Sequence, residues 1–261
     1  MDLAFRDLGG DGQPFVFLHG LFGSSQNWAG MGRRLRDRGR CFLLDLRNHG
    51  DSPHAPQHSL SACVQDVFEW ASRHSPGPLR LIGHSMGGLV AMGFAIAHPE
   101  LTAGVASLDI APRAYPEEHE AELRALSTDI GSCRSRRDLD ELLSSTLPDP
   151  FLRQFILMNA VRDGDGFRWR IDASILASST VARDFAGVSG FFGGPALLVA
   201  AGRSSYVDEE GREAMRRHFP AARIMTIPEA DHWLHVSAPG PVHRLLSDFL
   251  AGTEGDTAAM Q

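Results

Sequence analysis

The sequence predicts an α/β protein in which a doubly wound, mostly parallel sheet carries a helical cap insertion. Three observations predict this class. Short apolar runs alternate with amphipathic stretches, which is the order expected of right-handed β-α-β crossovers. Several of these runs are apolar throughout, as strands covered on both faces of a parallel sheet should be. One long segment, residues 112–187, interrupts the alternation and shows only helical patches.

The elements follow in chain order, and a strand is expected at each short apolar run. The runs at 15–18 and 196–201 contain no polar residue at all, which is typical of central strands. The six expected strands are 15–18, 41–46, 79–82, 105–110, 196–201 and 224–227. The amphipathic stretches between them predict helices at 28–38, 60–73, 87–97, 209–218 and 241–250.

The interruption divides the chain into three parts. Residues 1–111 and 188–252 are expected to form the α/β core, and residues 112–187 an all-helical cap over the ends of the sheet. The cap helices are expected within 117–130, 136–146, 151–161 and 172–185. Residues 253–261 are small and polar for the most part and are expected to form a flexible tail.

Composition narrows the classes of function. The formal charge of −7 argues against nucleic acid or an anionic membrane as a partner, because both are negatively charged. Cys41, Cys63 and Cys133 show no CxxC or Cys/His spacing, which favours a reducing, cytoplasmic location and no metal site. There is no apolar run of signal-peptide or membrane-span length and no phosphate-binding glycine loop. We therefore expect a monomer or homodimer that needs no cofactor and acts on a small molecule.

The strongest motif is Gly83-His84-Ser85-Met86-Gly87, which matches G-x-S-x-G between an expected strand and an expected helix. A serine at such a tight turn has strained backbone angles, and the flanking glycines avoid clashes with neighbouring elements. The turn exposes the serine hydroxyl to a substrate and a base. Ser85 is therefore the expected nucleophile, and the motif predicts hydrolytic chemistry.

An oxyanion hole needs two converging N–H donors, and the sequence offers both. The backbone N–H of Met86 follows the nucleophile at the positive end of a helix. The loop His19-Gly20-Leu21-Phe22, which follows the strand 15–18, supplies the second donor, for which we select Leu21. His19 is expected only to hold the loop by hydrogen bonds.

The base is expected after the last strand, because the chain order in this kind of active site is serine, acid, histidine. The segment Asp231-His232-Trp233-Leu234-His235 lies there. His232 is preferred over His235 because it lies in a loop, from which its imidazole can reach Ser85.

Four segments carry a family resemblance: His19-Gly20 with Trp28, 45–52 (DLRNHGDS), 83–88 (GHSMGG) and 231–233 (DHW). The chain resembles the α/β-hydrolase superfamily, and within it small bacterial carboxylesterases with "RNHG-S" and "LDIAP" segments. The resemblance spans nearly the whole chain and is weakest at 112–187. It implies that 47–52 is a structural loop rather than a catalytic one.

The acid departs from the pattern of most relatives, which place it just after the strand at 196–201. Here that loop reads Gly-Arg-Ser-Ser-Tyr-Val over 202–207, and serine cannot stabilise an imidazolium. Asp109 is the preferred acid, because a carboxylate among apolar neighbours needs a partner. The resemblance also implies it, since the similar esterases take their acid from this strand. Asp208 is the alternative, although its position before a helix also fits an N-cap.

Together these residues predict a serine esterase that hydrolyses small to medium acyl esters through an acyl-enzyme. Phe22, His84 and Trp233 are expected to line its substrate pocket. The same triad would serve a thioesterase, a lactonase or another acyl or C–C bond hydrolase, so these remain alternatives. A non-catalytic, ligand-binding member of the fold is a further alternative, kept open by the displaced acid.

Overall fold

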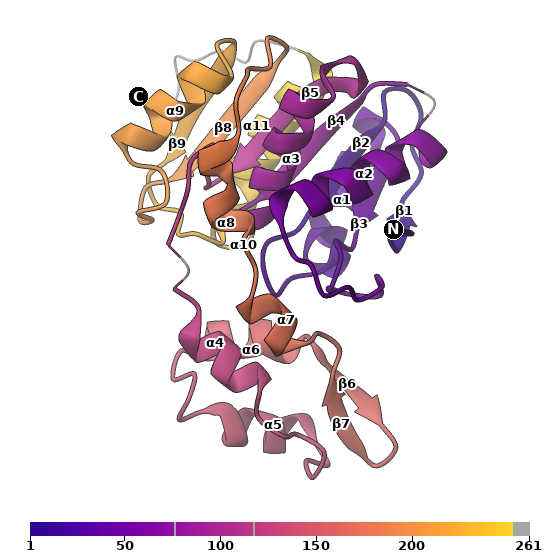
Figure 1. Cartoon of the computed structure of the whole chain (residues 1–261), viewed down its shortest axis with the longest axis vertical. Helices are drawn as coiled ribbons and strands as arrows, with labels where there is room; N and C mark the ends of the chain where they lie inside the picture. The colour runs from indigo at the N-terminus through magenta and orange to yellow at the C-terminus, as the bar shows by residue number, and fades with distance from the viewer. Residues whose placement is uncertain (76, 117, 253–261) are drawn as a thin grey trace.

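A seven-stranded sheet forms the centre of the protein, in the order β1-β3-β2-β4-β5-β8-β9 (Figure 1). The computed structural model describes residues 1–75, 77–116 and 118–252. Every neighbouring pair of strands is parallel except β1 and β3, which are antiparallel. The strands are β1 (Phe5–Asp7), β2 (Phe15–Leu18), β3 (Cys41–Leu44), β4 (Leu79–His84), β5 (Thr102–Leu108), β8 (Ala196–Ala201) and β9 (Ala222–Ile227). This topology confirms the predicted fold class.

Helices cover both faces of the sheet, so the strands are buried on two sides. On one face α1 (Ala29–Leu35) packs against α11 (Pro239–Ala251). On the other face α2 (Leu60–His74) packs on α3 (Met86–Ala97), and α8 (Val181–Asp184) contacts both. The helix α9 (Glu209–His218) packs beside the last strand, β9.

The alternation of side chains along each strand divides the core between the two faces. In β2, Phe15 and Phe17 belong to the cluster under α1 and α11. Val16 and Leu18 from the same strand belong to the cluster under α2 and α3. All four side chains are fully buried, which explains why the run is apolar throughout rather than alternating.

The core helices coincide closely with their predicted ranges, apart from the first. The expected helix at 28–38 is divided into η1 (Ser25–Trp28), α1 and η2 (Arg36–Arg38). The prediction missed β1, an edge strand of three exposed residues that pairs with β3.

The expectation of an all-helical segment at 112–187 is wrong in one part. Here β6 (Ala160–Asp163) and β7 (Gly166–Trp169) form an antiparallel hairpin, so the helix expected over 151–161 ends early. Gly164, with φ of +55°, supplies the left-handed residue of the turn. The other short elements of this segment are α4 (Glu120–Leu126), α5 (Arg136–Leu143), α6 (Pro150–Leu157), α7 (Ala173–Ala177) and η4 (Phe185–Gly187). Two short helices lie outside it, η3 (Pro99–Leu101) and α10 (Leu234–Ser237).

We call residues 112–187 the β5–β8 segment. Its α4 to α7 and its hairpin lie together on one side of the sheet layer, while α8 returns to the core (Figure 1). These elements share a third apolar cluster, which includes Leu139, Ile156 and Phe167. Part of the helix expected at 117–130 and the whole tail expected at 253–261 lie outside the described residues. In the part of the chain that is described, no helix has the length and apolar character needed to cross a membrane.

Candidate active site

Ser85 occupies the turn between β4 and α3, with φ of +51° and ψ of −125°. A non-glycine residue held in such a region costs on the order of 1–3 kcal/mol and persists only where its surroundings fix it. The Ser85 N–H donates to the Leu108 carbonyl at 3.1 Å, which ties the turn to β5. A Cβ on Gly83 would lie 2.1 Å from the Gly87 carbonyl oxygen, so the turn can close only with glycine there. The Ser85 hydroxyl is thereby held at the carboxyl edge of the sheet.

Asp109 follows the neighbouring strand β5 and also has a positive φ, of +51°. Its side chain is completely buried. One carboxylate oxygen, Oδ1, accepts from the Ala201 N–H at 2.9 Å, and the other, Oδ2, accepts from His232 Nδ1 at 2.8 Å. Both oxygens are therefore paired, as a buried carboxylate requires.

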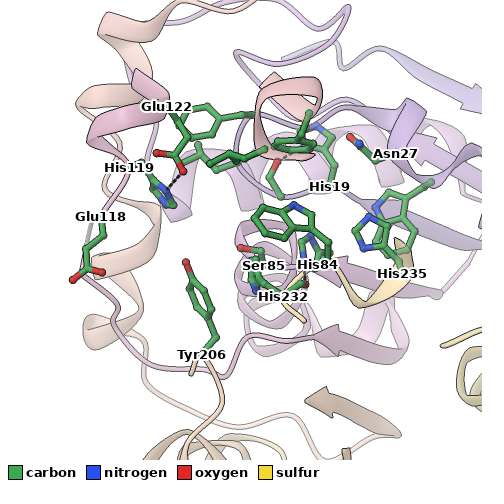
Figure 2. Close-up of a pocket in the computed structure, with 18 residues that line it drawn as sticks. His19, Asn27, His84, Ser85, Glu118, His119, Glu122, Tyr206, His232 and His235 are labelled. Carbon is green, nitrogen blue, oxygen red and sulfur yellow. Dashed lines mark hydrogen bonds and ion pairs between the residues drawn. The ribbon is translucent and has the colours of Figure 1, made fainter. Parts of the chain in front are cut away.

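His232 lies in the loop between β9 and α10, and it lines the same cavity as Ser85 (Figure 2). Because Nδ1 donates to Asp109, the neutral ring keeps Nε2 unprotonated and able to accept a proton. Ser85 Oγ forms no hydrogen bond within the described residues. In substrate-free enzymes the nucleophile–base bond is commonly loose and tightens when substrate binds.

Two further side chains hold His232 in place. His84 Nε2 donates to the His232 carbonyl at 2.8 Å. Burial lowers the pKa of His84 well below its ordinary value, and His232 and His235 lower it further, so the ring is neutral at pH 7. The Tyr206 ring stacks on the imidazole of His232, with centroids 4.2 Å apart and an interplanar angle of 21°. Burial raises the pKa of Tyr206, which keeps its phenol protonated.

The loop after β2 is fixed around Phe22, the residue that follows Leu21. His49 Nε2 accepts from the Phe22 N–H at 3.2 Å, and Asn159 donates to the Phe22 carbonyl at 2.8 Å. The backbone of Phe22, with φ of +63°, is thus fixed on both sides. Among the described residues the Leu21 N–H has no acceptor, and the Met86 N–H, at the first position of α3, has none within its helix.

Buried neutral histidines support this loop, as the sequence indicated for His19. His19 Nε2 accepts from the Leu46 N–H at 3.0 Å, and its Nδ1 donates to the Gly20 carbonyl. Burial lowers the pKa values of His19 and His49. In the segment 47–52, Arg47 pairs with the buried Asp66 at 2.6 Å, which agrees with a structural role.

The structure separates Asp208 from the histidine. Its Oδ1 accepts from the Gly211 N–H at 2.8 Å and caps α9. Its Oδ2 pairs with Arg113 at 3.1 Å. Asp109, not Asp208, therefore contacts His232. Asp208 is the N-cap of α9.

The three expected pocket residues, Phe22, His84 and Trp233, all line a cavity of about 220 Å³ together with Ser85 and His232. Sequence reasoning missed other members of this lining. Tyr206 comes from the loop that most relatives use for the acid, and His119 and Glu122 come from the β5–β8 segment (Figure 2). No local pattern marks these positions, because their contacts with the site are tertiary.

Glu122 is half-buried, and its Oε1 lies 3.8 Å from His119 Nδ1. Burial opposes ionisation of this carboxyl, but the interaction with His119 and a hydrogen bond from the backbone N–H of Glu122 together outweigh that effect, and the pKa lies below its usual value. Among residues 1–75, 77–116 and 118–252, no group of three or more His, Cys, Asp or Glu side chains is arranged to hold a metal ion.

The comparisons with known proteins agree with one another. A family described as the alpha/beta hydrolase fold matches residues 13–130. The sn-1-specific diacylglycerol lipase of Mus musculus is 34% identical, over 96% of this chain and 86% of the relative. Esterase YbfF of Escherichia coli is 29% identical, over 91% and 92% of the two chains. The solved structure of a marine microorganism esterase is 32% identical with a TM-score of 0.90, over 95% of this chain and 99% of that one.

Proposed function

The chain belongs to the α/β-hydrolase family and is a serine ester hydrolase, and we propose that Ser85, His232 and Asp109 carry out its reaction. The observation that supports this assignment most strongly is the placement of two strained residues. Ser85 and Asp109 follow adjacent parallel strands, and His232 lines the same cavity as Ser85, with its Nδ1 bonded to Asp109. A nucleophile, a base and a residue that orients the base are thus present in one site.

In the first step His232 Nε2 removes the Ser85 proton as Oγ attacks the carbonyl carbon of the ester. The C–O bond to the alcohol then breaks, and His232 returns the proton to the leaving alcohol oxygen. In the second step a water loses its proton to His232 and attacks the acyl-enzyme. Ser85 leaves with that proton, and the carboxylic acid is released. Asp109 holds the imidazole tautomer and balances its positive charge while the proton is on Nε2.

The negative charge of each tetrahedral intermediate falls on the former carbonyl oxygen. We assign its stabilisation to the backbone N–H groups of Leu21 and Met86, neither of which has another acceptor in the described structure. Removing one donor of such a pair typically costs about 10²–10³ in rate. The His49 and Asn159 bonds to Phe22 support the assignment, because they fix the loop before substrate arrives.

We further propose that the β5–β8 segment acts as a cap that closes over the site. Its residues His119 and Glu122 line the cavity opposite the triad, and Asn159 anchors it to the oxyanion loop. The three cysteines are free and buried, which supports a cytoplasmic location. The mouse relative is named a diacylglycerol lipase, and we include esters of neutral alcohols among the substrates.

The test is hydrolysis of a series of 4-nitrophenyl esters by the wild-type protein and by Ser85→Ala. We expect the wild type to turn over at least one ester and Ser85→Ala to lose about 10³-fold or more in kcat. Thioesters and lactones of the same acyl groups, tested in parallel, separate the alternatives that use the same triad. A Ser85→Ala protein that folds and keeps its activity would overturn the assignment.

A further inference from the structure

Two cavities meet at Ser85. The first, which we call the His232 cavity, has a volume of about 220 Å³ and includes His232, Phe22 and Trp233. The second, which we call the apolar cavity, has a volume of about 190 Å³ and includes Met86, Leu89 and Leu176. Four residues border both: Leu21, Ser85, His119 and Tyr206. An ester bound at Ser85 can therefore extend one half into each cavity.

The chemistry decides which half lies in which cavity. The leaving alcohol oxygen must receive its proton from His232, so the alcohol has to lie on the side of that imidazole. His232 lines only the first of the two cavities. The acyl group departs from the same carbon in a different direction, and the apolar cavity is the space available to it beside Ser85 and Met86.

The lining of the apolar cavity suits a hydrocarbon chain. Leu89 and Ile110 line it from the α/β core, and Leu123, Leu176 and Val181 line it from the β5–β8 segment. Glu120, the one carboxylate that lines it among the described residues, is exposed. An apolar cavity of about 150 Å³ holds a benzene molecule, which has six carbons. The slightly larger volume here corresponds to an acyl group of about six to eight carbons.

The His232 cavity has a different character. Glu122 lines it with its side chain only 16% exposed, and Glu118 stands exposed at its margin (Figure 2). Within the described residues, no lysine or arginine belongs to this lining. A carboxylate on the alcohol would meet Glu122 in a partly desolvated space, where like charges repel strongly.

We propose that this enzyme selects esters of uncharged acids of about six to eight carbons with neutral or cationic alcohols, the acyl group in the apolar cavity and the alcohol in the His232 cavity. This inference rests on the proposed function, since it places the ester at Ser85. The β5–β8 segment then contributes to the selection of the acyl group through Leu123 and Leu176 and to the selection of the alcohol through Glu122.

The acyl assignment is tested by changing the volume of the apolar cavity in both directions. Ala182, half-buried in its wall, becomes phenylalanine in the first variant, and Leu123 becomes alanine in the second. We measure kcat/KM for 4-nitrophenyl esters from acetate to dodecanoate. Ala182→Phe is expected to shift the optimum by about two or more carbons toward shorter chains, and Leu123→Ala to shift it toward longer ones. An unchanged optimum in the folded Leu123→Ala protein would overturn the assignment.

The alcohol assignment is tested with hexanoate esters of choline, butanol and glycolate, which carry a cationic, a neutral and an anionic alcohol. The wild type is expected to disfavour the glycolate ester. Glu122→Gln is expected to raise the glycolate-to-butanol ratio of kcat/KM by about five-fold or more, from the loss of one nearby charge. Glu141→Gln is the matched control, since it removes a carboxylate of α5 in the same β5–β8 segment that lines neither cavity, and its ratio should stay at the wild-type value.

The outcomes separate this inference from the proposed function. If Glu122→Gln shifts the acyl optimum while Ala182→Phe shifts the alcohol ratio, the two cavities are assigned the wrong way round. If the wild type hydrolyses none of these esters, the labelling of Ser85 by a fluorophosphonate, which needs no acyl selectivity, tells whether the nucleophile itself is absent or the substrate class is wrong. Either result would overturn the inference, but only an unreactive Ser85 would also overturn the proposed catalytic role.

Discussion

Replacing Asp109 by asparagine tests the acid of the triad with little change in shape. The two carboxylate oxygens have different partners, the Ala201 N–H at 2.9 Å and His232 Nδ1 at 2.8 Å. An asparagine has one acceptor oxygen, which can satisfy only one of them. If the oxygen keeps Ala201, the amide NH₂ faces His232 Nδ1 and imposes the tautomer in which Nε2 carries the proton. That Nε2 cannot accept a proton from Ser85.

The alternative orientation of the amide is also unfavourable. It would turn the NH₂ toward the Ala201 N–H and leave a buried donor unpaired, at a cost of about 1–3 kcal/mol. We therefore expect the wrong tautomer to predominate and kcat to fall by about 10³–10⁴-fold, as when a triad aspartate elsewhere becomes asparagine. The assay is ester hydrolysis at pH 7–8, with thermal unfolding to show that the variant is folded.

Asp208→Asn is the matched control, because it is the same chemical change at the competing aspartate. Asparagine is as good an N-cap as aspartate, so α9 should keep its first turn. Only the ion pair with Arg113 is lost, and the Asp208 side chain is 51% exposed, which makes that pair weak. We expect activity within about two-fold of wild type and a stability change below about 1 kcal/mol. A folded Asp109→Asn protein with near wild-type kcat would refute this reasoning, and a large loss in Asp208→Asn alone would move the acid to Asp208.

Three further predictions concern the ring stacked on His232, the buried side chain of His58 and the glycine that follows Met86. Tyr206→Leu removes the ring stacked on His232 and should lower kcat about five- to ten-fold, whereas Tyr206→Phe should restore it. Equal losses of kcat in both variants would assign the effect to the hydroxyl. Burial lowers the pKa of His58 to about 4, so its neutral form stabilises the fold above about pH 6.5 and this contribution is lost as the pH falls toward 4. Between pH 7 and pH 5 the free energy of unfolding of His58→Gln should therefore fall by about 2 kcal/mol less than that of the wild type, as measured by denaturant titration. An equal fall in both proteins would contradict this. Gly87→Ala places a Cβ 2.4 Å from the Leu18 carbonyl oxygen and should destabilise the fold by about 1–3 kcal/mol or more. A Cβ on Gly30 meets nothing within 4 Å, so the control Gly30→Ala should have the wild-type melting temperature or a higher one.

The parts of the site that sequence predicts best are those set by local geometry. Ser85 stands in a five-residue motif whose glycines are both required by close backbone contacts, that of Gly83 with Gly87 inside the turn and that of Gly87 with Leu18 at the end of β2. The Asp109–His232 contact spans 123 residues, and no spacing encodes it. It was nevertheless predictable, because a carboxylate among apolar residues needs a partner and the family resemblance pointed to the same strand.

The elements that sequence reasoning missed depend on non-local contacts. The strand β1 consists of three exposed residues, and its regular pairing is with β3, which follows it by more than 30 positions. The hairpin of β6 and β7 has strands of four residues with exposed charges, which is too short for a clear period of two. Its turn residues, Gly164 and Asp165, were the available signal. The stacking of Tyr206 on His232 and the two cavities at Ser85 follow from tertiary packing alone.

The central claim is that Ser85 carries the acyl group during turnover. It is tested most directly by mixing the enzyme with 4-nitrophenyl hexanoate, quenching with acid before the steady state, and locating the adduct by mass spectrometry of peptides. The mechanism predicts one hexanoyl group on the peptide containing Ser85, formed as nitrophenol is released and absent from Ser85→Ala. Turnover with the acyl group on another residue, or turnover that persists in Ser85→Ala, would contradict it.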